Sequence, residues 1–178
     1  YACTCPSCTA IGNTEKNATP AVTELILRLS QRFPRHFFFT TSYLTTQQVT
    51  DKQLPPNAGV IVSAINFPLR RIDGKDAKEK AFAGQLEQWK NVTKNIYIWD
   101  YINNFDDYLT PMPILKIARQ RLQFFKQHGA SGIFFNGSGY SYSSFDEMRT
   151  FVLSALLINP ELSVDNLTAS FFNQEYPA

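Results

Sequence analysis

Hydrophobic residues gather in four short runs, separated by polar loops and by longer segments with helical spacing. The runs are HFFFTTSY at 36–43, GVIVSAINF at 59–67, NIYIWDYI at 95–102 and SGIFFNG at 131–137. Nearly continuous apolar runs of this length are typical of parallel strands that are covered on both faces. We therefore expect four parallel strands.

The segments between these runs repeat apolar residues every three or four positions, as amphipathic helices do. A further short helix is expected over 164–172. The apolar stripes comprise Leu25, Leu29 and Phe33; Phe82, Leu86 and Trp89; Leu115, Ala118, Leu122 and Phe125; and Phe145, Met148, Val152 and Leu156.

Capping residues predict where the helices begin and end. Thr19 and Pro20 are suited to the N-cap and first helical position, and Pro111 is suited to the start of a later helix. Gly129 is a typical residue just after a helix end. Ser144, with a glutamate three residues later, predicts a capping box.

Strands that alternate with helices indicate an α/β fold in which crossovers join parallel strands. Either an open doubly wound sheet or part of a (β/α)8 barrel fits this order. A complete barrel takes about 250 residues and eight strands, so four strands would form half of one. Because 178 residues are too few to argue for two domains, we expect a single unit, residues 1–178. Because Tyr1 is not an initiator Met, we also expect further sequence upstream.

The charge pattern argues against a nucleic-acid partner, and the length of the apolar runs argues against a membrane-spanning helix. The chain has 17 Lys and Arg against 15 Asp and Glu, a net charge of +2, and the basic residues are scattered. We therefore expect no nucleic-acid partner. No run approaches the roughly 20 apolar residues of a membrane helix, so we expect no integral membrane segment in this chain.

Three cysteines, Cys3, Cys5 and Cys8, lie within six residues. A closed zinc site needs a fourth ligand, which His36 or His128 could supply only from far along the chain. A local disulfide with one free thiol, or three reduced thiols, are the simpler alternatives. We expect no cofactor, and a structural metal at the cysteines is the less favoured reading.

Each apolar run becomes polar at its end, where parallel α/β folds place their chemistry. Along the third run, Ile96, Ile98 and Asp100 share one face. Branched aliphatic residues usually fill a barrel interior, so we expect Asp100 to point inward at its mouth and the rings to lie beneath the helices. An Asp that caps a turn or pairs with an Arg is the structural alternative. The remaining candidate residues are Tyr43, Asn66, Trp99, Tyr101, Asn104 and Asn136.

Four segments, CTCPSC, WKNVTKNIYIWDYINNF, FFKQHGASGIFFNGSG and FVLSALLINPELSVDNL, together resemble an uncharacterised bacterial family of secreted, glycosidase-like proteins. That family is a domain of unknown function related to the α-glucuronidase and β-hexosaminidase TIM barrels. The resemblance implies the C-terminal half of a TIM barrel, strands five to eight, and a periplasmic or extracellular protein, a surface lipoprotein included. It also places a principal catalytic acid upstream of Tyr1.

We therefore expect a glycoside hydrolase that degrades a complex polysaccharide or glycan. Asp100 is the candidate catalytic residue, and the other strand-end residues are candidates for binding the carbohydrate substrate. Ordinary hydrolysis needs two carboxyl groups, and only Asp100 stands at a strand end here. A catalytically inactive carbohydrate-binding barrel is therefore the alternative. A nucleotide site is disfavoured, because Gly137 and Gly139 lack the third glycine of a dinucleotide motif.

Overall fold

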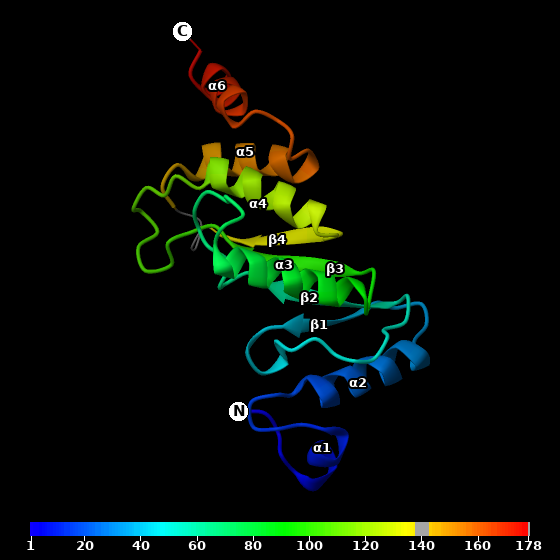
Figure 1. Cartoon of the computed structure of the whole chain (residues 1–178). Coiled ribbons are helices and arrows are strands. Elements are labelled where there is room, and N and C mark those ends of the chain that lie inside the picture. The colour runs from blue at the N-terminus through cyan, green and yellow to red at the C-terminus, as the bar shows by residue number, and fades with distance from the viewer. Residues whose placement is uncertain (138–142, 178) are drawn as a thin grey trace.

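The computed structural model describes residues 1–137 and 143–177 as a mixed α/β fold (Figure 1). Strands alternate with helices along most of the chain, as the sequence predicts. The elements are α1 (Pro6–Ile11), α2 (Thr19–Arg32), β1 (Phe38–Ser42), η1 (Leu44–Thr46), β2 (Ala58–Ser63), α3 (Ala77–Lys90), β3 (Ile96–Tyr101), α4 (Leu115–Gln127), β4 (Gly132–Asn136), α5 (Asp146–Ile158) and α6 (Val164–Glu175).

The four strands form one parallel sheet in the order β1-β2-β3-β4. Each strand therefore pairs with its neighbours in sequence, and α3 and α4 lie in the connections between the later strands. The register places Ile61 beside Tyr97 and Ser63 beside Trp99. All four carboxyl ends consequently meet at the same edge of the sheet, where the sequence places the candidate residues.

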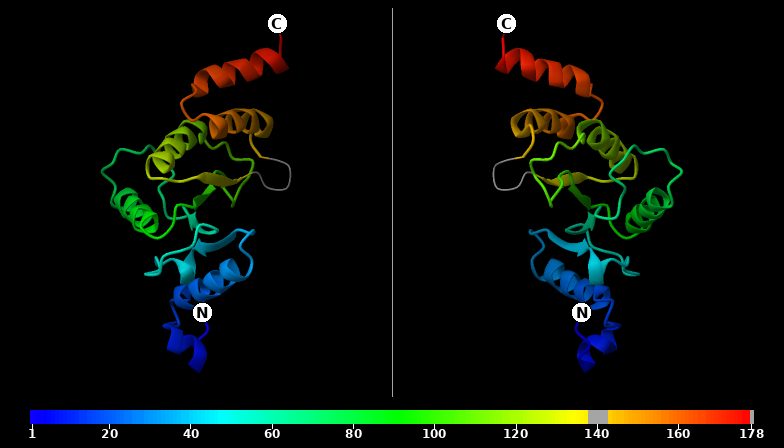
Figure 2. Two further views of the ribbon diagram at one scale, coloured as in Figure 1. Left: turned by 90° about the vertical axis from the view of Figure 1, so that its right-hand side faces the viewer. Right: turned by 90° about the vertical axis from the view of Figure 1, so that its left-hand side faces the viewer.

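The two faces of the sheet differ in their environment. One face, here called the covered face, packs against α3 and α4 through Val62 and Ile98. In Figure 2, α3 lies to one side of the strands. The other face, here called the open face, has no helix packed on its centre among the described residues. Its strand residues are Phe39, Thr41, Ile61, Ser63, Tyr97, Trp99, Tyr101, Phe134 and Asn136.

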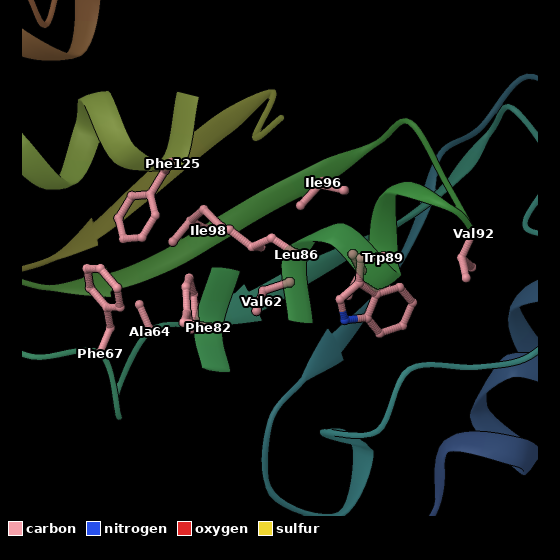
Figure 3. Close-up of a cluster of buried hydrophobic side chains, with 11 residues drawn as sticks. Val62, Ala64, Phe67, Phe82, Leu86, Trp89, Val92, Ile96, Ile98 and Phe125 are labelled. Carbon is pink, nitrogen blue, oxygen red and sulfur yellow. The ribbon is translucent and has the colours of Figure 1, made fainter. Parts of the chain in front are cut away.

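The main core lies between the covered face and α3. Leu86 and Trp89 of α3 pack against Ile96 and Ile98 of β3 (Figure 3). Trp89 is 1 % exposed and Leu86 is fully buried. The apolar stripe predicted for this helix is therefore confirmed, and its burial fixes α3 against the sheet.

Two helices start differently from the sequence prediction. Thr19 is the first residue of α2 rather than its cap, and the Asn17 side chain accepts the Thr19 N–H at 3.0 Å. Helix α4 begins at Leu115, four residues after Pro111. A second proline, Pro113, disfavours helical backbone at Met112, so the helix starts only after both prolines.

The capping box predicted at Ser144 is absent. The N-cap of α5 is Phe145, whose φ is 55°, and its side chain makes no capping hydrogen bond. Ser143 instead donates to the Asp146 carboxylate at 2.9 Å. The capping pattern was therefore one position out of register with the helix start.

The apolar stripe predicted for α2 does not face the core. Leu25 is 54 % exposed and Phe33 is 44 % exposed, whereas Thr23 and Ile26 are buried. The helix thus turns its more polar side toward the sheet and its neighbouring loops. Within the described residues, no helix combines the length and the apolar character needed to span a membrane.

Candidate functional site

Strand β3 turns its two sets of side chains opposite to the sequence expectation. Ile96, Ile98 and Asp100 lie on the covered face, fully buried. Tyr97 and Trp99 lie on the open face, where Tyr97 is 39 % exposed. The expected inward Asp100 with rings beneath the helices is therefore wrong. Aliphatic side chains pack densely beneath helices, whereas Tyr and Trp keep a polar end that favours partial exposure.

Asp100 forms a buried ion pair with Arg121 of α4. The Arg121 Nε donates to one carboxylate oxygen of Asp100 at 2.7 Å, and Nη2 donates to the other. Both side chains are sealed from solvent. The alternative that Asp100 pairs with an Arg is what the structure shows.

The third nitrogen of the Arg121 guanidinium is also paired. Its Nη1 donates to the Pro68 carbonyl at 2.6 Å and to the Phe67 carbonyl at 3.3 Å. The guanidinium also lies over the Phe67 ring, 4.5 Å from its centroid. This network holds the loop after β2 against α4 and leaves Asp100 facing protein rather than substrate. A catalytic role for Asp100 stays a prediction that this geometry does not favour.

A row of aromatic rings runs along the carboxyl edge of the open face. The Tyr43 and Trp99 centroids are 5.8 Å apart, and Trp99 stacks on Tyr101 at 5.6 Å with an interplanar angle of 25°. Phe105 continues the row, 6.0 Å from Tyr101. The structure thus brings three of the predicted binding residues, Tyr43, Trp99 and Tyr101, into one surface, here called the aromatic row.

The three predicted asparagines lie in different surroundings. Asn136 is beside Tyr101 in the register of β3 and β4, and is therefore next to the aromatic row. Asn104 turns toward its own loop, where its Oδ1 accepts the Asp106 N–H at 3.1 Å. Asn66 lines a cavity of about 640 Å³ together with Ser63 of β2, Gln47 after η1 and residues of α3. Only Asn136 clearly joins the row.

Two buried donors near this edge have no acceptor among the described residues. They are the Trp99 indole N–H and the Asn103 side-chain amide. Buried donors are normally paired, because an unpaired one costs about 1–3 kcal/mol. Trp99 belongs to the aromatic row, so one of these unpaired donors lies within it.

The sequence pattern missed two features of the site. Arg121 interrupts the apolar stripe of α4, and a charged residue on a buried helix face is a signal for an ion-pair partner. Phe39 was also missed, and its ring meets Tyr97 edge-on at 5.1 Å on the open face. The period of two in β1 places Phe39 and Tyr43 on the same face, which could have revealed it.

The three cysteines form a compact cluster beside α1. Their sulfur atoms all lie within 4.8 Å of one another, and none forms a disulfide. The Cys8 backbone N–H, followed by the thiols of Cys3 and Cys8, lowers the pKa of Cys5. Hydrogen bonds to the Cys3 and Cys5 sulfurs raise the pKa of Cys8 to about 11. The pKa of Cys5 therefore lies below that of Cys8.

The predicted glycine pair falls partly outside the described residues. Gly137 is described, but Gly139 lies within 138–142 and is not. The nucleotide alternative accordingly gains no support from this loop.

Comparison with known proteins and protein families identifies the family of this chain. No curated protein and no solved structure matches the chain. Residues 1–178 match the family described as "Domain of unknown function (DUF4838)". A match over the whole length shows that the chain belongs to this family of unknown function.

Proposed function

We propose that the open face binds a neutral polysaccharide within a glycoside-hydrolase-like barrel. The observation that carries this proposal is the aromatic row, in which Tyr43, Trp99 and Tyr101 lie side by side at the carboxyl edge of a parallel sheet. Ligands of parallel α/β folds bind at this edge. Flat aromatic faces with polar ends suit sugar rings, which pair an apolar face with a rim of hydroxyl groups.

The chemistry of the open face favours a neutral sugar. Its strand residues offer hydroxyl and amide groups from Thr41, Ser63 and Asn136, and include no Asp, Glu, Lys, Arg or His. An acidic sugar is usually held by a cation, most often a two-pronged Arg. Arg121, a strong candidate for that role by type, is already saturated by Asp100 and two backbone carbonyls.

Two versions of this function differ in whether the glycan is cut. Hydrolysis needs two carboxyl groups flanking the bond, about 5–5.5 Å apart for retention or 6.5–9.5 Å for inversion. The open-face strand residues supply neither group. In a hydrolase, this chain would hold the substrate while acids from elsewhere cut it. In a carbohydrate-binding barrel, the same face would hold the glycan without cleavage, and the buried Asp100 favours this second version.

A secreted location follows from the same proposal, because complex polysaccharides are met outside the cytoplasm. The balanced charge of +2 with scattered basic residues supports a carbohydrate rather than a nucleic acid as partner.

Affinity electrophoresis tests the binding proposal directly. The purified chain is run through gels that contain soluble xylan, mannan, mixed-linkage glucan or polygalacturonate. We expect retardation by at least one neutral polysaccharide and none by polygalacturonate. Tyr101→Ala should weaken binding about tenfold, since one aromatic stack contributes roughly 1.4 kcal/mol.

Tyr176→Ala is the matched control. Tyr176 is another tyrosine whose ring lies beside an aromatic neighbour, Phe172, but it is exposed and lies at the end of α6. The control should bind like the wild type. Equal retardation of wild type and Tyr101→Ala, or no retardation by any neutral polysaccharide, would overturn the proposal. Release of reducing ends from a bound polysaccharide would select the hydrolase version.

A further inference from the structure

We propose that Cys3, Cys5 and Cys8 hold one zinc ion that fastens the α1 segment, with a water molecule as the fourth ligand. The proposal is independent of the polysaccharide-binding face and concerns a different part of the chain. Its starting point is the convergence of three sulfur atoms, all within 4.8 Å of one another.

The spacing of the sulfur atoms is close to that of a tetrahedral zinc site. With Zn–S bonds of about 2.3 Å, two sulfur ligands of a tetrahedral ion lie about 3.8 Å apart. Contraction by at most about 1 Å would bring the three sulfurs to that distance. A disulfide would use two of the sulfurs and leave the third beside them, whereas a metal ion uses all three.

The backbone around the cluster is already fixed in the required shape. Asn13 is 4 % exposed and ties two of the three cysteine positions together. Its side-chain amide donates to the Cys3 carbonyl at 3.2 Å, and its backbone N–H donates to the Cys8 carbonyl at 3.0 Å. Asn13 is anchored in turn, because its Oδ1 accepts the Ala21 N–H of α2 at 3.0 Å.

No buried apolar side chain stabilises the α1 segment. Helix α1 has six residues, none of them buried, and its Ile11 is 42 % exposed. Helices this short are not stable in water on their own propensity. Structural zinc sites supply folding free energy where a small segment has no core of its own. A zinc ion would explain how α1 is held beside α2.

The ligand set selects the class of metal. Thiolates are soft ligands that suit zinc and monovalent copper, whereas magnesium and calcium prefer oxygen. Cys3 and Cys5 are exposed and Cys8 is partly so, which leaves room for water at the fourth position. This arrangement differs from the closed four-ligand site considered from sequence, and it does not require a distant histidine.

Metal binding is tested on the reduced, metal-free chain. Titration with Co²⁺ should give a thiolate-to-cobalt charge-transfer band that saturates at one ion per chain, and Zn²⁺ should displace it. Zn²⁺ should also protect all three thiols from a thiol reagent and raise the Tm. No charge-transfer band, or no protection by Zn²⁺, would overturn the proposal.

Substitutions distinguish the cysteine ligands from Asn13, which only supports their backbone. Cys3→Ser, Cys5→Ser and Cys8→Ser should each weaken Zn²⁺ binding by more than the roughly 10- to 100-fold that loss of a supporting group costs. Asn13→Ala should fall within that 10- to 100-fold range. Ser7→Ala, at an exposed position in the first turn of α1, is the matched control and should bind like the wild type. Unchanged affinity in all three cysteine variants would overturn the proposal.

Discussion

Asp100 on β3 and Arg121 on α4 share two hydrogen bonds, and neither side chain reaches solvent. Removing two charges from water is costly, and their mutual attraction offsets that cost only where the remaining donors are also paired. Here the Phe67 and Pro68 carbonyls pair them. The pair therefore joins a strand, a helix and a loop in one fixed arrangement.

Asp100→Asn should destabilise the fold strongly. The substitution leaves the Arg121 charge buried without its partner, which costs about 3–5 kcal/mol. Urea denaturation followed by circular dichroism measures the free energy of unfolding. If Asp100 were instead a catalytic acid with no structural role, the variant would keep its stability and lose only activity.

A double substitution should recover much of this loss. In Asp100→Leu combined with Arg121→Met, both charges of the buried pair are removed. Such apolar replacements of buried pairs are often neutral or stabilising. We expect the double variant to be more stable than either single variant. The same denaturation series gives the coupling free energy between the two residues.

Gly59→Ala should destabilise the sheet. A Cβ atom at this position would lie 2.4 Å from the Asn95 carbonyl oxygen and 2.6 Å from the Phe39 ring. The carbonyl belongs to the backbone and cannot move aside cheaply, so we expect a loss of about 1–3 kcal/mol, as for other overpacked sites. A midpoint of urea denaturation equal to that of the wild type would contradict this expectation.

Gly84→Ala should have the opposite effect. Gly84 lies inside α3, and nothing stands within 4 Å of the position its Cβ would take. Alanine is favoured over glycine in a helix interior by about 1 kcal/mol. The denaturation midpoint should therefore rise, and the contrast with Gly59→Ala serves as the internal control for both variants.

The charge of Asp76 should stabilise α3 in a pH-dependent way. The Lys78 N–H and then the Arg70 guanidinium lower the pKa of this N-cap carboxyl. Because the folded pKa lies below the unfolded value of about 3.9, the stabilisation is complete above that value and is lost as pH falls through the folded pKa.

Asp76→Asn keeps a capping side chain but removes its charge. The Tm of the variant should therefore lie below that of the wild type at neutral pH, and the two should converge in acid. Thermal melts at a series of pH values measure the difference. A gap in Tm that stays constant down to the lowest pH would show that the charge contributes nothing.

The order of strands and helices could be predicted from the sequence, because the apolar runs are long and distinct. Three of the four runs contain a whole strand, and β2 begins at Ala58, one residue before its run. The ends of helices were less predictable. The N-cap of α2 is Ala18 rather than Thr19, and the Thr19 N–H is paired by the side chain of Asn17, which no simple pattern singles out.

The orientation of β3 could not be predicted from its own sequence. Alternation correctly separates Ile98 and Asp100 from Trp99, but it does not say which set meets the helices. That choice depends on Leu86, Trp89 and Arg121, which come from other elements. The sequence correctly groups the rings of β3 on one face, but it places that face beneath the helices, where the structure has Ile98 and Asp100.

Gly132 determines the shape of the open face, although it has no side chain there. The ring of Tyr97 occupies the space where a Cβ of residue 132 would lie, 2.6 Å from the nearest ring atom. Any larger residue there would push this ring away from β4, and Phe39 packs against the same ring. The outline of the face is thus set by an absent side chain, and a substitution at position 132 alone would change it.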